Sequence, residues 1–149
     1  MAKEFWIGDV QSGDHDGKEV ELKGWVKRTR GSNKIRFVVL RDSTGTIQCV
    51  AKRDAIGDDA FEELKGALIE ASLILKGVVN VDERAPGGHE LVVTSAQLVG
   101  AVRADAPFPI TESAMESADG GETEFLLDNR HLYLRTSRMT TMLKIRSSV

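Results

Sequence analysis

The clearest pattern in the chain is an alternation of apolar and polar residues that begins at Val20 and includes Leu22 and Val26 on one side. Successive side chains of a β-strand point to opposite faces, so this alternation predicts a strand with one apolar face. Turn residues at 31–33 and 42–45 separate it from two further strand-like stretches, 35–40 and 46–51. Three strands joined by tight turns predict one half of a small barrel.

A helix is predicted after the third strand. Phe61, Leu64 and Leu68 lie at the spacing of one helical face. Asp58 or Asp59 is suited to cap the helix, with a glutamate at capping-box distance from the second of them. The stretch therefore predicts a single helix whose apolar side packs on the barrel.

Two more strands are predicted at residues 72–81, with a bend at Gly77, and at residues 91–99. The order β-β-β-α-β-β is that of an OB-fold, a five-stranded Greek-key barrel with its helix between the third and fourth strands. We therefore predict a mainly β fold, followed by a C-terminal linker and helix. Such barrels present strands two and three to oligonucleotides or oligosaccharides, although other small barrels have similar strand counts. Trp6 is expected to cover one end of the barrel.

The character of the sequence changes past residue 100, and we predict a barrel domain over residues 1–104 and a separate region over 105–149. Residues 111–124 are polar and acidic, which predicts a mobile linker. Thr136 or Ser137 could cap a final helix with an apolar stripe. Because this helix has no stop signal, we expect it to run to Val149 and the natural polypeptide to be longer.

Positive charge is concentrated in the strand-rich part of an acidic chain. Residues 18–53 contain ten Lys and Arg residues against three Asp and Glu residues, a net charge of +7. The whole chain has a net charge of −3, so the remaining residues sum to −10. A basic region on an acidic protein favours a polyanion bound at one place.

Several classes of protein are excluded by what the sequence lacks. Cys49, which we expect in the core, is the single cysteine, so neither a disulfide framework nor a multi-cysteine metal site can form. The histidines are far apart, at positions 15, 89 and 131, and the motifs of common enzyme classes are missing. We therefore expect no catalytic residue and no metal site. No apolar run of transmembrane length and no signal peptide occur, which predicts a cytoplasmic protein without a membrane partner.

Three residues of the basic strands have the chemistry of single-stranded RNA recognition, in which aromatic rings stack on bases and polar side chains read base edges. Phe37 is the aromatic candidate. The basic residues near it in sequence are Lys34, Arg36 and Arg41. Gln48 offers both a donor and an acceptor to a base such as uracil, and Arg30 could reach a phosphate or a base. The alternatives are that Phe37 belongs to the core and that Gln48 is a solvated strand residue.

Six segments occur in the order found in one family: GWVKRTRG, IRFVVLRDSTGTIQCV, VDERAPGG, FPIT, FLLDNRHLYLRT and KIRSSV. Together they resemble the N-terminal region of asparaginyl-tRNA synthetases of the archaeal type, which are class IIb aminoacyl-tRNA synthetases. The resemblance covers nearly the whole chain. The second segment is shared with aspartyl-tRNA synthetases, which makes the corresponding domain of those enzymes the alternative.

The resemblance implies a role for four residues in binding an anticodon. In the family, the phenylalanine at the position of Phe37 stacks on the middle base, a uridine, and the glutamine at the position of Gln48 reads it. The arginine at the position of Arg30 helps to hold this base. An acidic residue in the loop between the fourth and fifth strands contacts the first base, and Glu83 is the matching residue.

The resemblance also implies that the chemistry lies elsewhere in a longer enzyme. The implied partner is the GUU anticodon loop of tRNA(Asn). The parent would be an asparagine–tRNA ligase that uses ATP and Mg²⁺ and forms a homodimer, whereas this chain alone would bind no cofactor, catalyse nothing and be a monomer. A self-standing OB-fold binder of single strands is a further hypothesis, as is a barrel with a structural or protein-binding role. The segment at residues 126–135 argues against a self-standing binder, because it resembles the family's hinge to the catalytic domain.

Overall fold

The computed structural model describes residues 5–110 and 123–148. The chain divides into two compact units between Pro107 and Phe108. The predicted domain boundary after residue 104 stays a prediction. The predicted mobile linker at residues 111–124 lies outside the described residues, apart from its last two.

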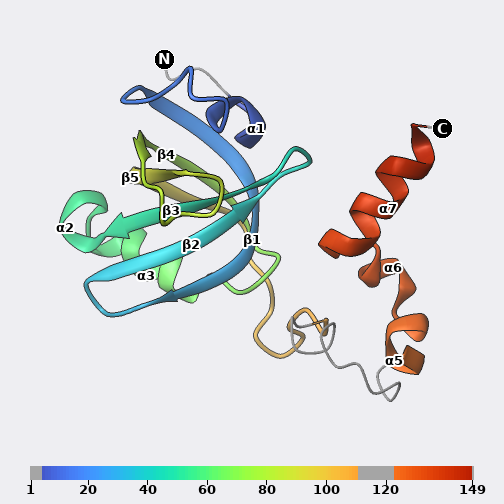
Figure 1. Ribbon diagram of the computed structural model, residues 1–149. Coiled ribbons are helices and arrows are strands. Elements are labelled where there is room, and N and C mark those ends of the chain that lie inside the picture. Colours follow the sequence, from blue (N-terminus) through green and yellow to red (C-terminus); the bar gives the residue numbers. More distant parts are fainter. Residues whose placement is uncertain (1–4, 111–122, 149) are drawn as a thin grey trace. The chain divides into compact units, whose positions relative to one another are not determined.

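The first unit is a closed barrel of five strands (Figure 1). The strands are β1 (Glu19–Gly31), β2 (Ile35–Arg41), β3 (Thr46–Lys52), β4 (Ser72–Val81) and β5 (His89–Gly100). Around the barrel their order is β1-β2-β3-β5-β4, and β3 pairs with β5 in parallel while the other pairs are antiparallel. This order confirms the predicted OB-fold. The sequence pattern placed the start of β5 at Leu91, two residues too late.

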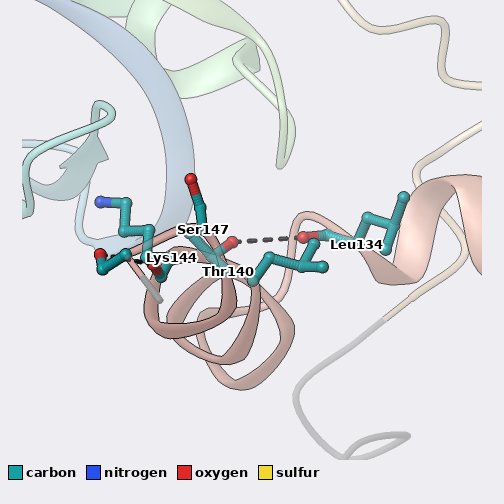
Figure 2. A pocket seen from close by; sticks show the side chains of 6 residues that line it. Leu134, Thr140, Lys144 and Ser147 are labelled. Carbon is teal, nitrogen blue, oxygen red and sulfur yellow. Dashed lines mark hydrogen bonds between the residues drawn. The ribbon is translucent and has the colours of Figure 1, made fainter.

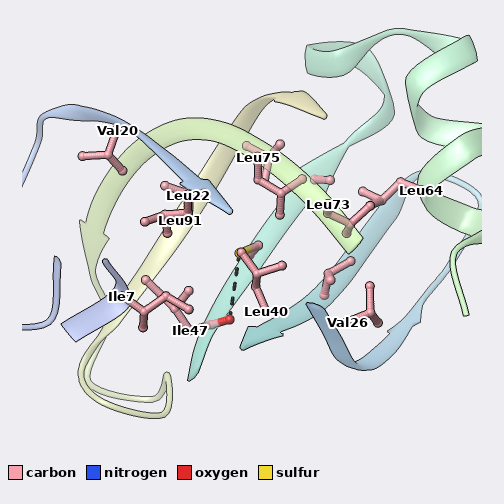
Figure 3. Close-up of a cluster of buried hydrophobic side chains, with 14 of the residues drawn as sticks. Ile7, Val20, Leu22, Val26, Leu40, Ile47, Leu64, Leu73, Leu75 and Leu91 are labelled. Atoms are coloured by element: carbon pink, nitrogen blue, oxygen red, sulfur yellow. Dashed lines mark hydrogen bonds between the residues drawn. The ribbon is translucent and has the colours of Figure 1, made fainter. Parts of the chain in front are cut away.

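Apolar side chains from all five strands fill the barrel (Figure 3). In β1, the predicted alternation places Val20, Leu22 and Val26 inside at 0% exposure. Cys49 is equally buried, and burial raises the pKa of its thiol far above the usual range. It is therefore a core residue, as predicted.

One end of the barrel is closed by α1 (Ile7–Val10) instead of Trp6. Ile7 and Val10 are fully buried, whereas Trp6 is 57% exposed, so the prediction for Trp6 is wrong. The backbone N–H of Ile7 donates to a carboxylate oxygen of Asp42 over 2.8 Å. The Asp42 carboxylate also accepts hydrogen bonds from backbone N–H groups of the turn between β2 and β3. Asp42 thus ties α1 to that turn.

Two short helices, α2 (Arg53–Ile56) and α3 (Asp58–Gly66), occupy the place of the single predicted helix. The residue that precedes α3 is Gly57, with a φ of 84° that favours glycine. Neither Asp58 nor Asp59 is therefore the cap; both lie in the first turn, where their charges suit the helix dipole.

The apolar face of α3 agrees with the prediction in part. Phe61 and Leu64 are buried, as the spacing predicted. The helix ends at Gly66, so Leu68 lies beyond it, and Ala67 is the next buried residue.

The second unit contains α5 (Thr123–Asp128), α6 (Arg130–Tyr133) and α7 (Ser137–Ser147). The hydroxyl of Thr136 accepts a hydrogen bond from the backbone N–H of Met139 over 3.4 Å, which confirms Thr136 as the cap of α7. The helix ends at Ser147, and Val149 lies outside the described residues. Within the described part of the chain, no helix has the length and apolar character needed to cross a membrane.

Candidate nucleic-acid interface

The register of the barrel arranges outward-facing residues in two neighbouring rows. The Phe37 row consists of Arg30, Phe37, Val50, Val92 and Val78, which are paired from strand to strand. The Gln48 row consists of Arg28, Val39, Gln48, Glu90 and Asn80, paired in the same way. Paired residues share a face of the sheet, so each row crosses the outside of the barrel from β1 to β4.

Phe37 lies on this outer face. Its neighbour Val38 points into the barrel and is 1% exposed, while the Phe37 ring is half-buried at the surface. The guanidinium carbon of Arg30 lies 5.5 Å from the centroid of the ring, within the range of a cation–π contact. The structure thus brings Arg30 and Phe37 together and leaves the aromatic residue outside the buried core.

Gln48 stands in the adjacent row with its amide outside the barrel. The residues on either side of it, Ile47 and Cys49, point inward and are fully buried. Among the described residues, no protein group forms a hydrogen bond with the Gln48 amide or with the Arg30 guanidinium. Both groups can therefore bond to a ligand without breaking a hydrogen bond of the fold.

Glu83 lies apart from these rows, in the loop between β4 and β5, where it is exposed. The loop is folded on itself, since the backbone N–H of Asp82 donates to the carbonyl oxygen of Gly88 over 3.1 Å. At its end, the His89 imidazole lies 3.1 Å from the Asp16 carboxylate. These contacts fix the shape of the loop but do not bring Glu83 into register with Gln48.

A second acidic residue, Glu90, is the direct strand partner of Gln48. Asn80 donates a hydrogen bond from its side-chain amide to one oxygen of the Glu90 carboxylate over 3.1 Å, which orients that carboxylate. Sequence reasoning missed Glu90 because the fifth strand was started at Leu91. A strand that begins at His89 places Glu90 at an outward position by simple alternation.

The arginines of the basic stretch are divided between the outer face and the fold itself. Arg28 and Arg30 share the face of Phe37. Two others that are near Phe37 in sequence bond to the protein itself: Arg36 donates to the carbonyl oxygen of Lys65 over 3.2 Å, and Arg41 forms an ion pair with a carboxylate oxygen at 2.9 Å. The carboxylate is that of Glu70, whose side chain is 7% exposed. Part of the positive charge counted in the sequence thus bonds to other parts of the protein.

Two hollows have no residue of these rows in their lining. One, of about 310 Å³, lies between two exposed tryptophans on the barrel; its lining residues include Trp6, Trp25, Ile74 and Val99. The other, of about 610 Å³, is bordered by α7 (Figure 2). There the Thr140 hydroxyl donates to the carbonyl oxygen of Leu134 over 3.2 Å, so this polar group is already occupied. Among the described residues no cluster of side chains could hold a metal ion.

A five-stranded Greek-key barrel that presents an aromatic ring, a free amide and arginines on adjacent strands defines an OB-fold barrel of the nucleic-acid-binding class. Comparison with known proteins agrees, because the tRNA anti-codon family model, described as an OB-fold nucleic acid binding domain, matches residues 20–99. The chain belongs to this family.

Curated relatives resemble the chain beyond the barrel. The asparagine–tRNA ligase of Thermoplasma acidophilum is 40% identical over 143 residues, which cover 96% of this chain and 31% of the relative. That of Pyrococcus furiosus is 37% identical over 149 residues, or 100% of this chain and 32% of the relative. The chain thus spans about a third of the length of these relatives.

Solved structures show the same likeness. The asparaginyl-tRNA synthetase of Pyrococcus horikoshii is 36% identical with a TM-score of 0.83, covering 99% of this chain and 33% of the other. A putative aspartyl-tRNA synthetase of Leishmania major, at 20% identity and a TM-score of 0.77, covers 91% of this chain and 28% of the other. At that identity the second likeness concerns the fold alone.

Proposed function

We propose that this chain is the anticodon-binding domain of an asparagine–tRNA ligase and that it binds the GUU anticodon loop of tRNA(Asn). The observation that carries the proposal is the pairing of two adjacent outward rows, one with an aromatic ring and the other with a free amide. This pair of groups suits a base that is stacked and read at its edge.

In this proposal Phe37 stacks on the middle uridine and Gln48 reads it. Base–aromatic stacking contributes about 1–3 kcal/mol and does not depend on the base. The Gln48 amide adds selectivity, because it can donate to one uracil carbonyl and accept from the ring N–H. Arg30, beside the Phe37 ring, is placed to bind the phosphate or the edge of the stacked base.

The first anticodon base is a guanine, which presents N–H donors that suit a carboxylate. Glu83 is the residue that the family resemblance assigns to this contact. The register supports Glu90 instead, since Glu90 is the strand partner of Gln48 and Asn80 orients its carboxylate. We therefore assign the contact to Glu90.

The activity of the complete enzyme would depend on protein outside this chain. The relatives are about three times as long as the matched region, and we propose that asparagine activation with ATP and Mg²⁺ occurs in the part they have in addition. The Pyrococcus horikoshii enzyme has been solved in complex with asparaginyl-adenylate, which supports adenylate chemistry in the parent. We further propose a cytoplasmic enzyme, with a homodimeric parent and a monomeric isolated chain.

Two alternatives are less well supported. An aspartyl-tRNA synthetase domain would have the same fold, but relatives at 37–40% identity are asparagine–tRNA ligases. A self-standing single-strand binder would need only the barrel, yet the relatives match this chain through its C-terminal unit as well.

Replacing Phe37 tests the proposal directly. Phe37→Ala should weaken binding of a GUU anticodon stem-loop by about 5- to 150-fold, which corresponds to the loss of one stacked base. Trp25→Ala is the matched control, because Trp25 is another exposed aromatic residue of the barrel, 46% exposed and outside the two rows. Affinities would be measured by fluorescence anisotropy at one salt concentration. Equal losses in both variants, or no loss for Phe37→Ala, would contradict the proposal.

A further inference from the structure

Arg53, at the start of α2, holds the tip of the hairpin that joins β1 to β2. The tip consists of residues 31–34, all of them exposed. The backbone N–H of Arg53 donates to the carbonyl oxygen of Lys34 over 2.9 Å, and its Nε donates to the carbonyl oxygen of Asn33 over 2.8 Å. One residue thus forms two hydrogen bonds to a tip that leads directly from Arg30 to the strand of Phe37.

The rest of the Arg53 guanidinium is occupied by α3. Its Nη1 atom donates to the Asp58 carboxylate over 2.9 Å, and its Nη2 atom donates to Glu62. The hydrogen bond from Arg53 is the largest of the effects that lower the pKa of Glu62. The guanidinium carbon also lies 4.5 Å from the centroid of the buried Phe61 ring.

These contacts leave Arg53 unsuited to bind RNA itself. Every nitrogen of its guanidinium already donates to the protein, one face covers the Phe61 ring, and the side chain is 28% exposed. Three of its five guanidinium N–H groups are used in this way, so a phosphate could form fewer bonds with Arg53 than with a free arginine. The geometry instead suits a clamp, because a planar guanidinium can bond in several directions at once.

We propose that Arg53 is a positioning residue for the anticodon site, because it fixes the hairpin tip so that Arg30 stays beside the Phe37 ring. The inference rests on the proposed function. A loop that is held in its bound conformation before the ligand arrives loses less freedom on binding, so the clamp should raise affinity without contacting RNA. A second hydrogen bond, from Arg36 to the carbonyl oxygen of Lys65, also holds β2. The loss of the Arg53 bonds alone should therefore lower the affinity only in part.

Two variants of Arg53 test the clamp against a simple charge effect. Arg53→Ala and Arg53→Lys should both weaken GUU stem-loop binding by about 2- to 10-fold, the effect of releasing one or two ordered side chains. Lysine keeps the positive charge but lacks the fork that bonds Asn33, Asp58 and Glu62 together. Arg103→Ala is the matched control, because Arg103 also pairs with an aspartate but lies outside the barrel strands. A wild-type affinity of Arg53→Lys for the stem-loop would overturn the proposed role of Arg53 as a clamp.

A double variant separates positioning from a general structural role. Arg30→Ala should weaken binding, and adding Arg53→Ala should then weaken it no further, because the clamp acts through Arg30. Full additivity would overturn the proposal, as would loss of the folded barrel in both Arg53 variants, judged by circular dichroism. If Arg30→Ala and Phe37→Ala themselves leave binding unchanged, the proposed anticodon site is wrong, and this outcome is distinct from failure of the clamp.

Salt dependence supplies a further readout, measured in an Arg30→Ala background, where the clamp has no Arg30 contact to act on. In that background the slope of log K against log salt should be the same with and without Arg53→Ala, whereas loss of a direct phosphate contact lowers it by about 0.7. A lower slope after Arg53→Ala would show that Arg53 contacts RNA and would overturn the positioning role.

Discussion

Phe37 and Val38 are neighbours in sequence, yet the first is half-buried on the outer face and the second is 1% exposed inside the barrel. The sequence left Phe37 undecided between core and ligand platform, because the second strand is apolar on both of its faces. The strand register places Phe37 on the outer face, where it is paired with Arg30. The bonds of Arg36 and Arg41 could not be predicted from the sequence, because their partners, Lys65 and Glu70, are far away in sequence and close only after folding.

Two single residues, Glu83 and Glu90, are the candidates for the contact to the first anticodon base. Glu90→Gln should weaken binding of the GUU stem-loop by about 10- to 100-fold, because hydrogen bonds to a charged group contribute about 1.5–3 kcal/mol. Glu83→Gln should change it by less than about threefold. Both substitutions keep the size of the side chain, and glutamine at position 90 can still accept the bond from Asn80. Titrations of the two variants would be compared, and a larger loss for Glu83→Gln would return the role to the loop.

At the scale of the elements, the sequence predicted all five strands and their order, but it misjudged the segment between β3 and β4. The capping-box spacing from Asp59 to Glu62 suggested a helix start, yet Glu62 bonds to Arg53 instead of to the helix start. A glycine with positive φ precedes α3, and Arg53 links α3 to the β1–β2 hairpin. The spacing between Asp59 and Glu62 in the sequence could not reveal that Glu62 accepts a hydrogen bond from Arg53.

The bend predicted at Gly77 lies at an irregularity in the pairing of β4 with β5. A Cβ atom at Gly77 would lie 2.2 Å from the carbonyl oxygen of Val92, so a side chain there would force the two strands apart. Gly77→Ala should therefore lower the free energy of unfolding by about 1–3 kcal/mol.

Gly66→Ala is the matched control for this substitution. Gly66 ends α3, and nothing lies within 4 Å of the position of its Cβ. It should be neutral or stabilising, because alanine favours the helix. Urea denaturation compares the two variants, and a Gly77→Ala protein as stable as the wild type would disprove the close approach of the strands.

On the scale of the whole chain, the charge count of the sequence is only a partial guide to the surface. The excess of +7 over residues 18–53 predicted a basic site, but Arg36, Arg41 and Arg53 donate to other parts of the protein. Arg28 and Arg30 remain on the face of Phe37. A site with few arginines and a stacking ring should depend on base contacts as well as on phosphate attraction, as the proposed selection of one anticodon requires.

If Phe37 and Gln48 bind the anticodon as we propose, the barrel distinguishes the middle base of the anticodon. The most direct measurement is a binding titration of the wild-type chain with two stem-loops, GUU and GCU, that differ only at that base. The uridine loop should bind about 5- to 150-fold more tightly, because a cytidine would leave polar groups at Gln48 poorly paired, at about 1–3 kcal/mol. Gln48→Ala should abolish the difference. Equal binding of both loops by the wild type would contradict the account and would leave the chain as a general binder of RNA.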